Sequence, residues 1–378
     1  MKKYLFYTLA VVFVAGTIVS AKGPDTVRPK SQTRFIVHTE SEAALGLERA
    51  CARVKNNKAL IVLQCDDVVG QELGLQEDIR VFAADAGANT QIGANIVQGG
   101  GNTGSSTKIA ILDTGYNYLH SELSSSYSGG YDFVNNDNDP MDDNGHGSHV
   151  GGLIAADGIN TSAKGVAPDA AVVALKVLDL NGSGFFSDVV EAIYWAVNGP
   201  DNIFGNGDES GIAAMNLSLG TGKPYVYKGF CDSILPDLTN AIKYAREHNI
   251  LVAVAAGNEG RAGVSLPGCI SYSTTVGAVN SSDQIASFSG RGSALDIVAP
   301  GVSLFGPWLG TSYVTISGTS MATPIITGVA ALVHTAHPTY SAVKVEEALI
   351  KTAKNLGKAG KDNDSGWGRV RANNAVTY

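Results

Sequence analysis

The chain has 378 residues, and its 27 basic and 35 acidic side chains give a formal net charge of −8 at pH 7. Hydrophobic residues make up 44% of it, which excludes wholesale disorder, and the acidic balance argues against nucleic acid as a main partner. Only 16% of residues are charged, against about 25% in an average soluble protein, and 45 residues are glycine, so we expect a compact body with many turns.

The first 21 residues have the pattern of a secretory signal peptide. Lys2 and Lys3 give a positive start, an uncharged apolar run follows, and small residues at 19–21 form a cleavage site. The run at 4–20 is nearly long enough to span a bilayer, so a membrane anchor is the alternative. The small-residue ending and the polar segment after it favour cleavage. We therefore expect a signal peptide at 1–21 and a secreted protein, extracellular or periplasmic, with no membrane contact after cleavage.

Residues 33–85 have the pattern of a small α+β unit. Two apolar runs, at 34–37 and 60–63, flank a stretch rich in Ala, Glu and Leu that is typical of a helix. A third run at 79–82 follows a polar loop. Gly, Asn, Gln and Ser then dominate from Gly87 to Ser106, which predicts a linker or a lead-in lying along the surface.

From Lys108 onward, apolar runs alternate with helix-like segments. Strands are expected at Ile109–Leu112, Ala171–Val177, Ala213–Leu217, Ile250–Ala256, Thr275–Val279 and Asp296–Ala299. Helices are expected between them at Val150–Ala156, Asp188–Val197 and Leu238–His248. Strands that are apolar throughout and separated by helices predict an α/β fold with a doubly wound, mostly parallel sheet covered on both faces. Ligands of such folds bind beyond the carboxyl ends of the strands.

Asp113 directly follows the first of these strands, in the triplet Asp-Thr-Gly. A carboxylate in that place is costly to keep charged unless a polar group pairs with it. The same triplet is used by pepsin-like aspartic proteases, which need a second, similar carboxylate to share a proton. The only candidate, Asp364 in Asp-Ser-Gly, has no apolar strand before it, so the sequence argues against an aspartic dyad.

His146 lies between two glycines, which let the backbone turn tightly into a helix and leave the imidazole accessible. His149 is three residues further on, and because such positions share a helix face, a metal-binding pair is the alternative. A catalytic zinc needs at least one further protein ligand, and the sequence has no His-Glu-x-x-His motif. We therefore expect His149 to be a packed histidine and His146 to be a base.

Ser320 lies in a run of small residues just before an apolar helix expected at Ile325–Thr335. A serine at a helix start often only caps the helix. Here the small neighbours leave the hydroxyl exposed, the helix dipole favours negative charge at this end, and Pro324 fits the first turn. A hydroxyl nucleophile needs a base, and that base needs an orienting acid. Ser320, His146 and Asp113 supply this set.

In this order and context, the three motifs resemble those of the subtilisin-like serine endopeptidases, the subtilases of peptidase family S8. The resemblance extends from about residue 92 to residue 375. It implies a three-layer subtilisin-like fold in which Asp113 orients and stabilises the imidazole, His146 acts as general base and then as general acid, and Ser320 attacks the scissile carbonyl.

Asn258 follows an apolar strand and resembles the residue that supplies the side-chain donor of the family's oxyanion hole. The alternative is a turn-forming Asn-Glu-Gly. The backbone N–H of Ser320 would be the second donor. Near His146, Ser148 stands where the family usually has Thr and Gly151 where it usually has Ala, and both changes are small.

The resemblance also implies where an extended peptide binds. Two short segments resemble those that clamp a substrate as an added strand: Gly182, Ser183 and Gly184, and Ser218, Leu219 and Gly220. Phe186 would form an aromatic wall for the fourth residue before the cut, and Ala256, Gly257 and Gly220 would form the walls of the primary pocket. Because glycine walls leave room, we expect broad specificity with a preference for large apolar residues directly before the cut (P1).

An acidic loop before His146 resembles the calcium-binding loop of some thermostable subtilases. Its candidate ligands for a structural calcium ion are Asp137, Asp139, Asp142 and Asp143, and the alternative is a solvated acidic turn. A second calcium site of the family matches 157–163 in length, but Ile159 stands where a ligating Asn is expected. The resemblance implies no cofactor for catalysis.

Four cysteines allow three pairings. Cys51 and Cys65 lie in the N-terminal unit, and Cys231 and Cys269 lie in the catalytic body. A bridge between these parts would tether the leader after its removal, so we expect Cys51–Cys65 and Cys231–Cys269. Export permits disulfides.

The unit at 33–85 resembles the family's propeptide, which assists folding and inhibits the enzyme until it is cleaved. The expected domains are a signal peptide at 1–21, a propeptide at 22–88 and a catalytic domain at 89–378, with self-processing between about residues 84 and 91. The insertion at 199–211 is polar and predicts a surface loop.

The expected partners are polypeptide substrates and the chain's own propeptide, and the enzyme would act as a monomer. Two other functions remain open at this point. One is a catalytically silent, secreted binding protein on the same fold. The other is a metal-dependent hydrolase that uses His146 and His149.

Overall fold

The computed structural model describes residues 32–38, 51–56, 60–66, 76–77, 87–200, 203–205, 207 and 211–378. The chain divides into two compact units, residues 1–83 and 84–378. The boundary between them lies five residues before the expected end of the propeptide at residue 88. The signal peptide at 1–21 and the run at 79–82 lie outside the described residues. No described helix is both long enough and apolar enough to cross a membrane.

The smaller unit contains a four-stranded antiparallel sheet with the order β2-β3-β1-β4. β1 (Gln32–His38) and β3 (Leu60–Asp66) contain the two apolar runs that the sequence placed in strands. β2 (Ala52–Asn56) and β4 (Gln76–Glu77) have no apolar run, so hydrophobicity alone did not predict them.

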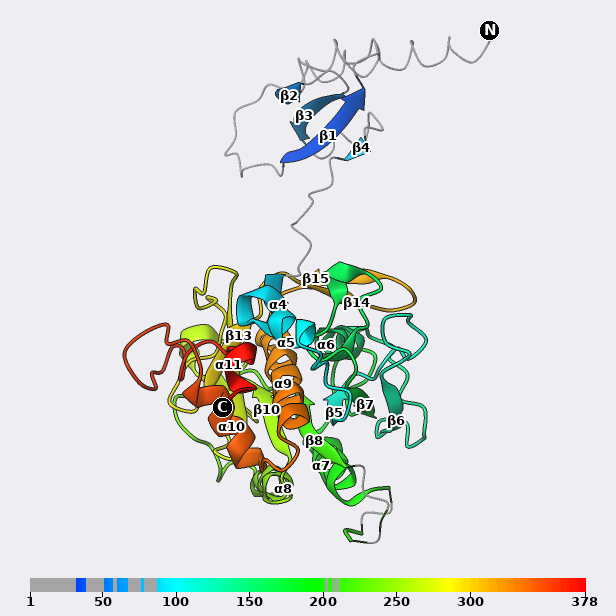
Figure 1. Cartoon of the computed structure of the whole chain (residues 1–378). Coiled ribbons are helices and arrows are strands. Elements are labelled where there is room, and N and C mark those ends of the chain that lie inside the picture. The colour runs from blue at the N-terminus through cyan, green and yellow to red at the C-terminus, as the bar shows by residue number, and fades with distance from the viewer. Residues whose placement is uncertain are drawn as a thin grey trace. The chain divides into compact units, whose positions relative to one another are not determined.

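The larger unit is built on a seven-stranded sheet with the order β13-β12-β10-β8-β5-β7-β6, in which all neighbours are parallel (Figure 1). Its strands are β5 (Lys108–Asp113), β6 (Tyr127–Asp132), β7 (Ala171–Lys176), β8 (Ile212–Leu217), β10 (Leu251–Ala255), β12 (Thr274–Val279) and β13 (Ile297–Pro300). All except β6 coincide with predicted runs. β6 lies at the edge of the sheet and its sequence, YSGGYD, has no apolar pattern.

Helices cover both faces of this sheet, as the parallel pattern requires. On β5, Ile109 and Ile111 belong to one apolar core, while Ala110 and Leu112 belong to the core on the opposite face, and all four are at most 1% exposed. The first core is completed by α6 (His146–Ala155) and α9 (Thr319–Ala336), and the second by α7 (Phe186–Asn198) and α8 (Pro236–Glu247). The continuous apolar runs of the sequence therefore reflect burial on both sides of each strand.

The segment expected to be a linker forms two short helices, α4 (Gly87–Ile92) and α5 (Ala94–Gly99). Ile92 is 1% exposed, the side chain of Asn89 donates to Lys164 O at 2.8 Å, and that of Gln91 donates to Asn280 O at 2.9 Å. Of the two alternatives, the linker was wrong, whereas a lead-in that lies along the surface agrees with the structure: a few long-range contacts, rather than a periodic apolar pattern, hold these helices in the larger unit.

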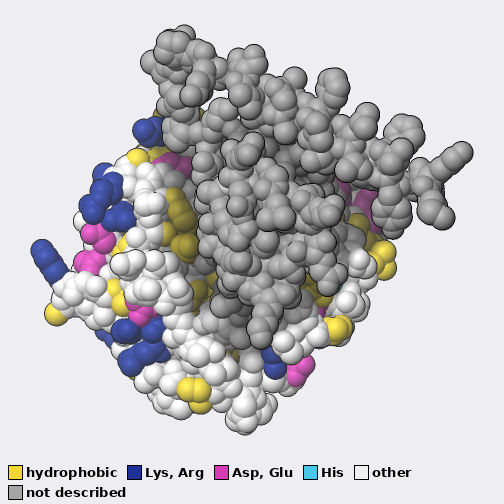
Figure 2. Space-filling view, turned by 90° about the horizontal axis from the view of Figure 1, so that it is seen from above, with side chains coloured by type: hydrophobic (Ala, Val, Ile, Leu, Met, Phe, Trp, Pro, Cys, Tyr) yellow, Lys and Arg dark blue, Asp and Glu magenta, His cyan; other side chains and the backbone are white. Residues whose placement is uncertain are grey.

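The remaining described elements of the larger unit complete its edges. They are α10 (Ala342–Lys351), α11 (Ala372–Ala375), the short helices η1 (Thr161–Ala163) and η2 (Gly260–Ala262), and the antiparallel pairs β9 (Val226–Tyr227) with β11 (Val264–Ser265) and β14 (Leu304–Pro307) with β15 (Tyr313–Ile316). On the face shown in Figure 2, the described surface mixes small groups of hydrophobic side chains with basic and acidic ones.

Both disulfides have the predicted pairing. Cys51 is bonded to Cys65, with their Cα atoms 4.5 Å apart, and Cys231 is bonded to Cys269, with their Cα atoms 5.4 Å apart. Each bond therefore lies within one of the two units.

The parallel register brings several polar residues to one edge of the sheet. Asp113 ends β5 and lies opposite Lys176 at the end of β7, Ser218 follows β8, and Asn258 comes shortly after β10. β5 lies between β7 and β8, where the chain order of the strands reverses. Such a switch point is where open α/β sheets bind ligands.

Gly151 on α6 packs directly against Tyr116. A Cβ atom at position 151 would lie 2.2 Å from the Tyr116 ring, which is fully buried and whose hydroxyl lies 2.7 Å from Ser126 Oγ. The packing of this buried tyrosine is therefore coupled to the absence of a side chain at Gly151.

We expect Gly151→Ala to lower the free energy of unfolding by about 1–3 kcal/mol, because the added methyl group overlaps the Tyr116 ring. Urea-induced unfolding measures this change. Gly99→Ala is the matched control: nothing lies within 4 Å of a Cβ there, so stability should stay the same or rise by up to about 1 kcal/mol. Equal effects of the two substitutions would contradict the coupling.

Candidate active site

Asp113 and His146 form a hydrogen-bonded pair at the carboxyl edge of the sheet. Asp113 is fully buried, and its Oδ1 lies 2.7 Å from His146 Nδ1 and accepts from the N–H of Thr114 at 2.7 Å. Asp113 Oδ2 has no hydrogen-bond partner among the described residues. The side chain of His146 is 27% exposed and lines a cleft. The pair thus has a buried acid behind an accessible imidazole.

Two glycines bring the start of α6 against the end of β5. A Cβ at Gly147 would lie only 2.1 Å from Gly115 O, so no larger residue permits this approach. Gly145 has a φ of 107°, which glycine adopts readily, and a Cβ there would overlap the Trp308 ring. Gly145 therefore serves the tight turn that the sequence predicted as well as close packing, whereas Gly147 is needed for close packing.

Asp142 is a second buried carboxylate that organises this approach. Its Oδ1 accepts from Gly145 N at 2.8 Å and from Thr114 Oγ1 at 2.9 Å. Its Oδ2 accepts from both the N–H and the hydroxyl of Ser148, at 2.8 and 2.6 Å. Asp142 thus connects the turn after Asp113 to the first turn of α6, and Ser148, where the family usually has Thr, provides the required hydroxyl.

The pKa values of the two histidines of α6 move in opposite directions. Burial alone would lower the pKa of His146, but the charge of Asp113 and its hydrogen bond outweigh burial, and the charge of Asp142 adds to them, so the pKa is raised. Burial lowers the pKa of His149 to about 4. His149 is fully buried, and its Nε2 lies 3.1 Å from Leu304 O. His146 therefore has the proton affinity of a base, and His149 is a neutral packed histidine.

Ser320 is the second residue of α9 and lines the same cleft as His146. Its hydroxyl donates to Ser218 O at 3.1 Å, and Ser218 Oγ donates back to Ser320 O at 2.7 Å. No hydrogen bond between Ser320 Oγ and His146 occurs among the contacts of the described residues. Catalytic hydrogen bonds are often absent or long before substrate binds, and a rotation of the Ser320 side chain would redirect its hydroxyl.

Asn258 is held by its carbonyl oxygen. Asn258 Oδ1 accepts from the N–H of Thr319 at 3.0 Å and from its hydroxyl at 3.1 Å. These donors fix which end of the side-chain amide is the carbonyl, so Nδ2 remains a donor, and Asn258 lines the cleft. Its carbonyl oxygen is thus held by Thr319, the residue that precedes Ser320.

Most of the predicted binding residues lie around one cleft of about 530 Å³. Those that line it are Gly182, Ser183, Gly184, Phe186, Ser218, Leu219, Gly220 and Gly257, together with His146, Asn258 and Ser320. Ala256 does not line it: its side chain is fully buried in the core under α7 and α8, and Ala255 lines the cleft instead. The prediction for Ala256 was therefore wrong by one residue.

Two lining residues, Glu259 and Ser265, were not predicted. Ser265 Oγ donates to Glu259 Oε2 at 2.7 Å, and a Cβ at Gly257 would lie 1.9 Å from that Ser265 hydroxyl. A Cβ at Gly220 would lie 3.4 Å from Ser265 Cβ. The two predicted glycine walls therefore face Ser265. Glu259 directly follows Asn258 and could have been inferred from that neighbour, whereas no motif marks Ser265.

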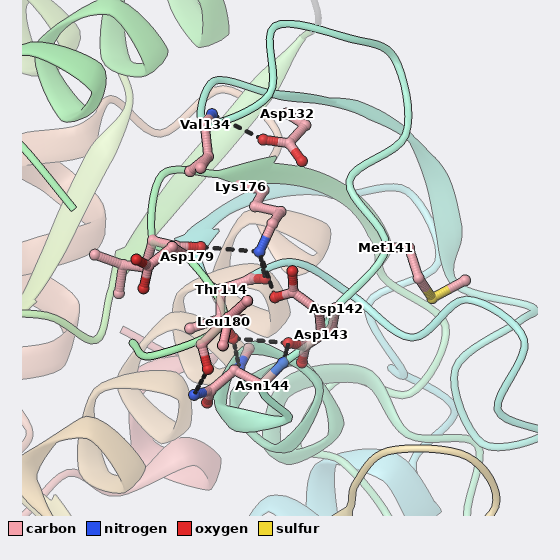
Figure 3. Close-up of polar contacts among 12 residues, drawn as sticks. Thr114, Asp132, Val134, Met141, Asp142, Asp143, Asn144, Lys176, Asp179 and Leu180 are labelled. Carbon is pink, nitrogen blue, oxygen red and sulfur yellow. Dashed lines mark hydrogen bonds and ion pairs between the residues drawn. The ribbon is translucent and has the colours of Figure 1, made fainter. Parts of the chain in front are cut away.

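The four residues of the expected calcium set do not form a cation site. Asp137 Oδ1 accepts from Asp139 N, and Asp139 Oδ1 accepts from the Tyr118 hydroxyl. Both oxygens of Asp142 accept from N–H and hydroxyl donors, and Asp143 pairs with Lys176 (Figure 3). Across the described part of the chain, no group of three or more His, Cys, Asp or Glu side chains could hold a metal ion. Of the four residues, only Asp142 has both carboxylate oxygens engaged by donors, and the four carboxylates do not converge on one point, so the structure does not support the expected calcium site.

The loop matching the second calcium site also presents donors instead of oxygen ligands. The fully buried carboxylate of Glu122 accepts from the backbone N–H groups of Gly158, Ile159 and Asn160, at 2.8, 3.1 and 2.6 Å. The hydroxyl of Tyr313 donates to the same carboxylate at 3.0 Å. An anion of the chain itself therefore anchors this loop.

We expect acid to destabilise the protein partly through His149. The unfolded histidine has a pKa of about 6.5 and the folded one a pKa of about 4, so between these values the unfolded chain binds more protons. Above about pH 6.5, protonation of His149 costs no stability. As the pH falls below this value, the free energy of unfolding decreases, and the loss reaches about 3 kcal/mol near pH 4. Urea unfolding of wild type and His149→Gln across this range measures it. An identical pH dependence of the two proteins would contradict the assignment.

Comparisons with known proteins agree with this geometry. Residues 104–368 match the Subtilase family. The chain is 39% identical over 275 residues to a thermophilic serine proteinase of Bacillus sp. (strain AK1), and the alignment covers 72% of this chain and 62% of that protein. It is 39% identical over 350 residues to Subtilisin E of Bacillus subtilis (strain 168), covering 90% of this chain and 83% of the relative.

A solved structure is similar as well. The crystal structure of a cold adapted subtilisin-like serine proteinase superimposes with a TM-score of 0.59 and 32% sequence identity, covering 71% of this chain and 88% of that one. The family match extends over most of the chain and includes the three motifs that the sheet edge brings together. The chain belongs to the subtilase family.

Proposed function

We propose that this chain is a secreted serine endopeptidase that hydrolyses peptide bonds with Asp113, His146 and Ser320 and matures by cutting its own precursor. The observation that carries the proposal is the 2.7 Å hydrogen bond between Asp113 and His146 beside the cleft that Ser320 and Asn258 also line. The presence of a buried acid, a base, a hydroxyl and an amide donor around this cleft supports a peptidase over a silent binding protein.

In the proposed reaction, the Ser320 hydroxyl leaves Ser218 O, turns toward His146 and attacks the scissile carbonyl carbon as His146 takes its proton. Asp113 stabilises the imidazolium that forms, in keeping with the raised pKa of His146. The negative oxygen of the tetrahedral intermediate accepts from Asn258 Nδ2 and from the N–H of Ser320. His146 then protonates the leaving amine, and water completes the cycle through the same base.

An extended substrate would lie between the segments Gly182–Gly184 and Ser218–Gly220, which line the cleft together with His146 and Ser320. Both segments would pair with it through backbone groups, which gives affinity without strict sequence preference. The pocket around Gly220 and Gly257 supports a preference for large apolar P1 residues.

Self-processing would occur before α4. The side chains of Asn89 and Gln91 are hydrogen-bonded to Lys164 O and Asn280 O. A cut after these residues would remove those hydrogen bonds from the mature enzyme. Within the range expected for the self-processing site, residues 84–91, the cut is therefore proposed among the first few residues, before α4 begins at Gly87. Signal cleavage after residue 21 and a propeptide up to the processing site complete the proposed precursor. No cofactor takes part in this mechanism, and calcium at the acidic loop is not part of the proposal.

We expect Ser320→Ala to abolish both peptide cleavage and maturation. A serine-directed covalent inhibitor should label wild type and not the variant, and N-terminal sequencing should find the processing site only in wild type. Ser317→Ala, three residues earlier and with a hydroxyl that only accepts from Ser303 N, is the matched control and should be labelled normally. Activity that survives Ser320→Ala but disappears with a chelator would instead support the metal-dependent hydrolase.

We expect a peptide library to show the highest kcat/KM for substrates with aromatic or long aliphatic P1 residues. Gly220→Val should lower kcat/KM for these substrates by about tenfold, because its methyl groups enter the pocket opposite Ser265. Substrates with Ala at P1 serve as the internal control and should change little. Strict cleavage after Lys or Arg would contradict the pocket assignment.

A further inference from the structure

Lys176 is a buried cation that the catalytic set does not use. It ends β7 directly opposite Asp113, and its side chain is 1% exposed. Its ammonium group donates three hydrogen bonds, to Thr114 O at 2.7 Å, to Asp143 Oδ1 at 2.7 Å and to Leu178 O at 2.9 Å (Figure 3). All three protons of the ammonium group are thus accounted for.

A charge in this position is expensive, since the preceding five residues of β7 are apolar and an apolar side chain would fill the same space. Removing an ammonium group from water costs several kcal/mol unless its partners compensate it. The only carboxylate among the three partners is Asp143, whose side chain is 45% exposed. Because an apolar side chain could fill this position in the sheet, we look for the role of the cation in the three groups that accept its hydrogen bonds.

The three acceptors belong to three different parts of the active site. Thr114 follows Asp113 in the turn at the end of β5. Asp143 precedes His146 by three residues. Leu178 lines the cleft at the start of the segment that continues to Gly184. One ammonium group therefore joins three parts of the chain: the turn at 113–114, the loop at 143–146, here called the histidine loop, and the segment 178–184, here called the substrate-binding segment.

The start of the substrate-binding segment is tied to Asp113 by its backbone, since the N–H groups of Val177 and Leu178 donate to Asp113 O at 2.9 and 3.1 Å. Its links to the histidine loop, in contrast, are made by side chains. His146 is already held by Asp113 and, through α6, by both oxygens of Asp142. Residues 180–185 are exposed, and a second link to the histidine loop is the Asn144 side chain, which donates to Leu180 O at 3.0 Å (Figure 3). Loss of the ammonium group would loosen this segment while leaving the pair of Asp113 and His146 in place.

We propose that Lys176 is a positioning residue that holds the substrate-binding segment 178–184 at a fixed distance from the Asp113 turn and the His146 loop. The inference rests on the proposed peptidase function and deepens it. Lys176 does not touch the substrate, because it is buried behind the cleft that the described residues form. Its ammonium group also supplies the positive charge beside Asp143 that the sequence had led us to expect from calcium.

The test compares a long and a short substrate. Lys176→Met keeps the length of the side chain and removes its charge. For a peptide amide with four residues before the cut, KM should rise by about tenfold with kcat within about threefold of wild type, because a charged hydrogen-bonding group has been lost from the support of the binding segment. For an ester of a single amino acid, which does not reach along that segment, kcat/KM should stay within about threefold of wild type.

Two further variants keep the inference falsifiable. Lys243→Met, on the exposed side of α8, is the matched control and should leave both substrates unaffected. If Lys176→Met does not fold, Asp143→Ala replaces it, since Asp143 is partly exposed; KM for the long substrate should then rise by about threefold, with the ester unchanged.

The outcomes separate this inference from the function on which it rests. Equal losses on the long and the short substrate, or an unchanged KM for the long one, would overturn the positioning role while wild-type activity still supports the peptidase. If wild type cleaves neither substrate, or if Ser320→Ala cleaves both as well as wild type does, the proposed function fails and the inference fails with it.

Discussion

The active site depends on how closely the first turn of α6 approaches the end of β5. With Gly147 packed on Gly115 O, where a Cβ would lie at 2.1 Å, the imidazole of His146 reaches Asp113 at 2.7 Å. Any side chain at position 147 would push the helix away from the strand. Because β5 is central in a parallel sheet, the same edge also receives Ser218 and Asn258. Backbone proximity at one point therefore sets the geometry of the Asp113–His146 pair.

Buried charges in the larger unit are matched by groups of the chain itself. Asp142 accepts from the backbone and from hydroxyls at the start of α6, Glu122 accepts from three consecutive N–H groups and from Tyr313, and Lys176 donates to three loops. Each group is buried and costly to desolvate unless it is fully hydrogen-bonded. The same condition accounts for Asp142, whose two oxygens both serve internal contacts, and for Asp143 Oδ1, which pairs with Lys176.

Much of the fold could be predicted, because buried parallel strands have a local signature. The runs at β5, β7, β8, β10, β12 and β13 and the helices between them follow from apolar residues alone. β6 could not be predicted, since an edge strand of sequence YSGGYD has no such run. The sequence did not predict α4 and α5 as helices and left a linker or a lead-in along the surface as the two alternatives. The reason is that contacts distant in the chain hold these helices, such as that of Gln91 with Asn280, 189 residues away.

The sequence by itself determined which residues could do chemistry: Asp113, His146 and Ser320 have the required groups, and their strand and helix contexts are local. Only the tertiary structure decided how side chains point and what occupies them. In the structure, Ala255 rather than Ala256 lines the cleft, and Ser265 lies in the pocket. Asp143 pairs with Lys176. The physical reason is that hydrogen-bond partners and the direction of a side chain depend on residues distant in the chain, and an acidic loop carries no local sign of which donors will reach it.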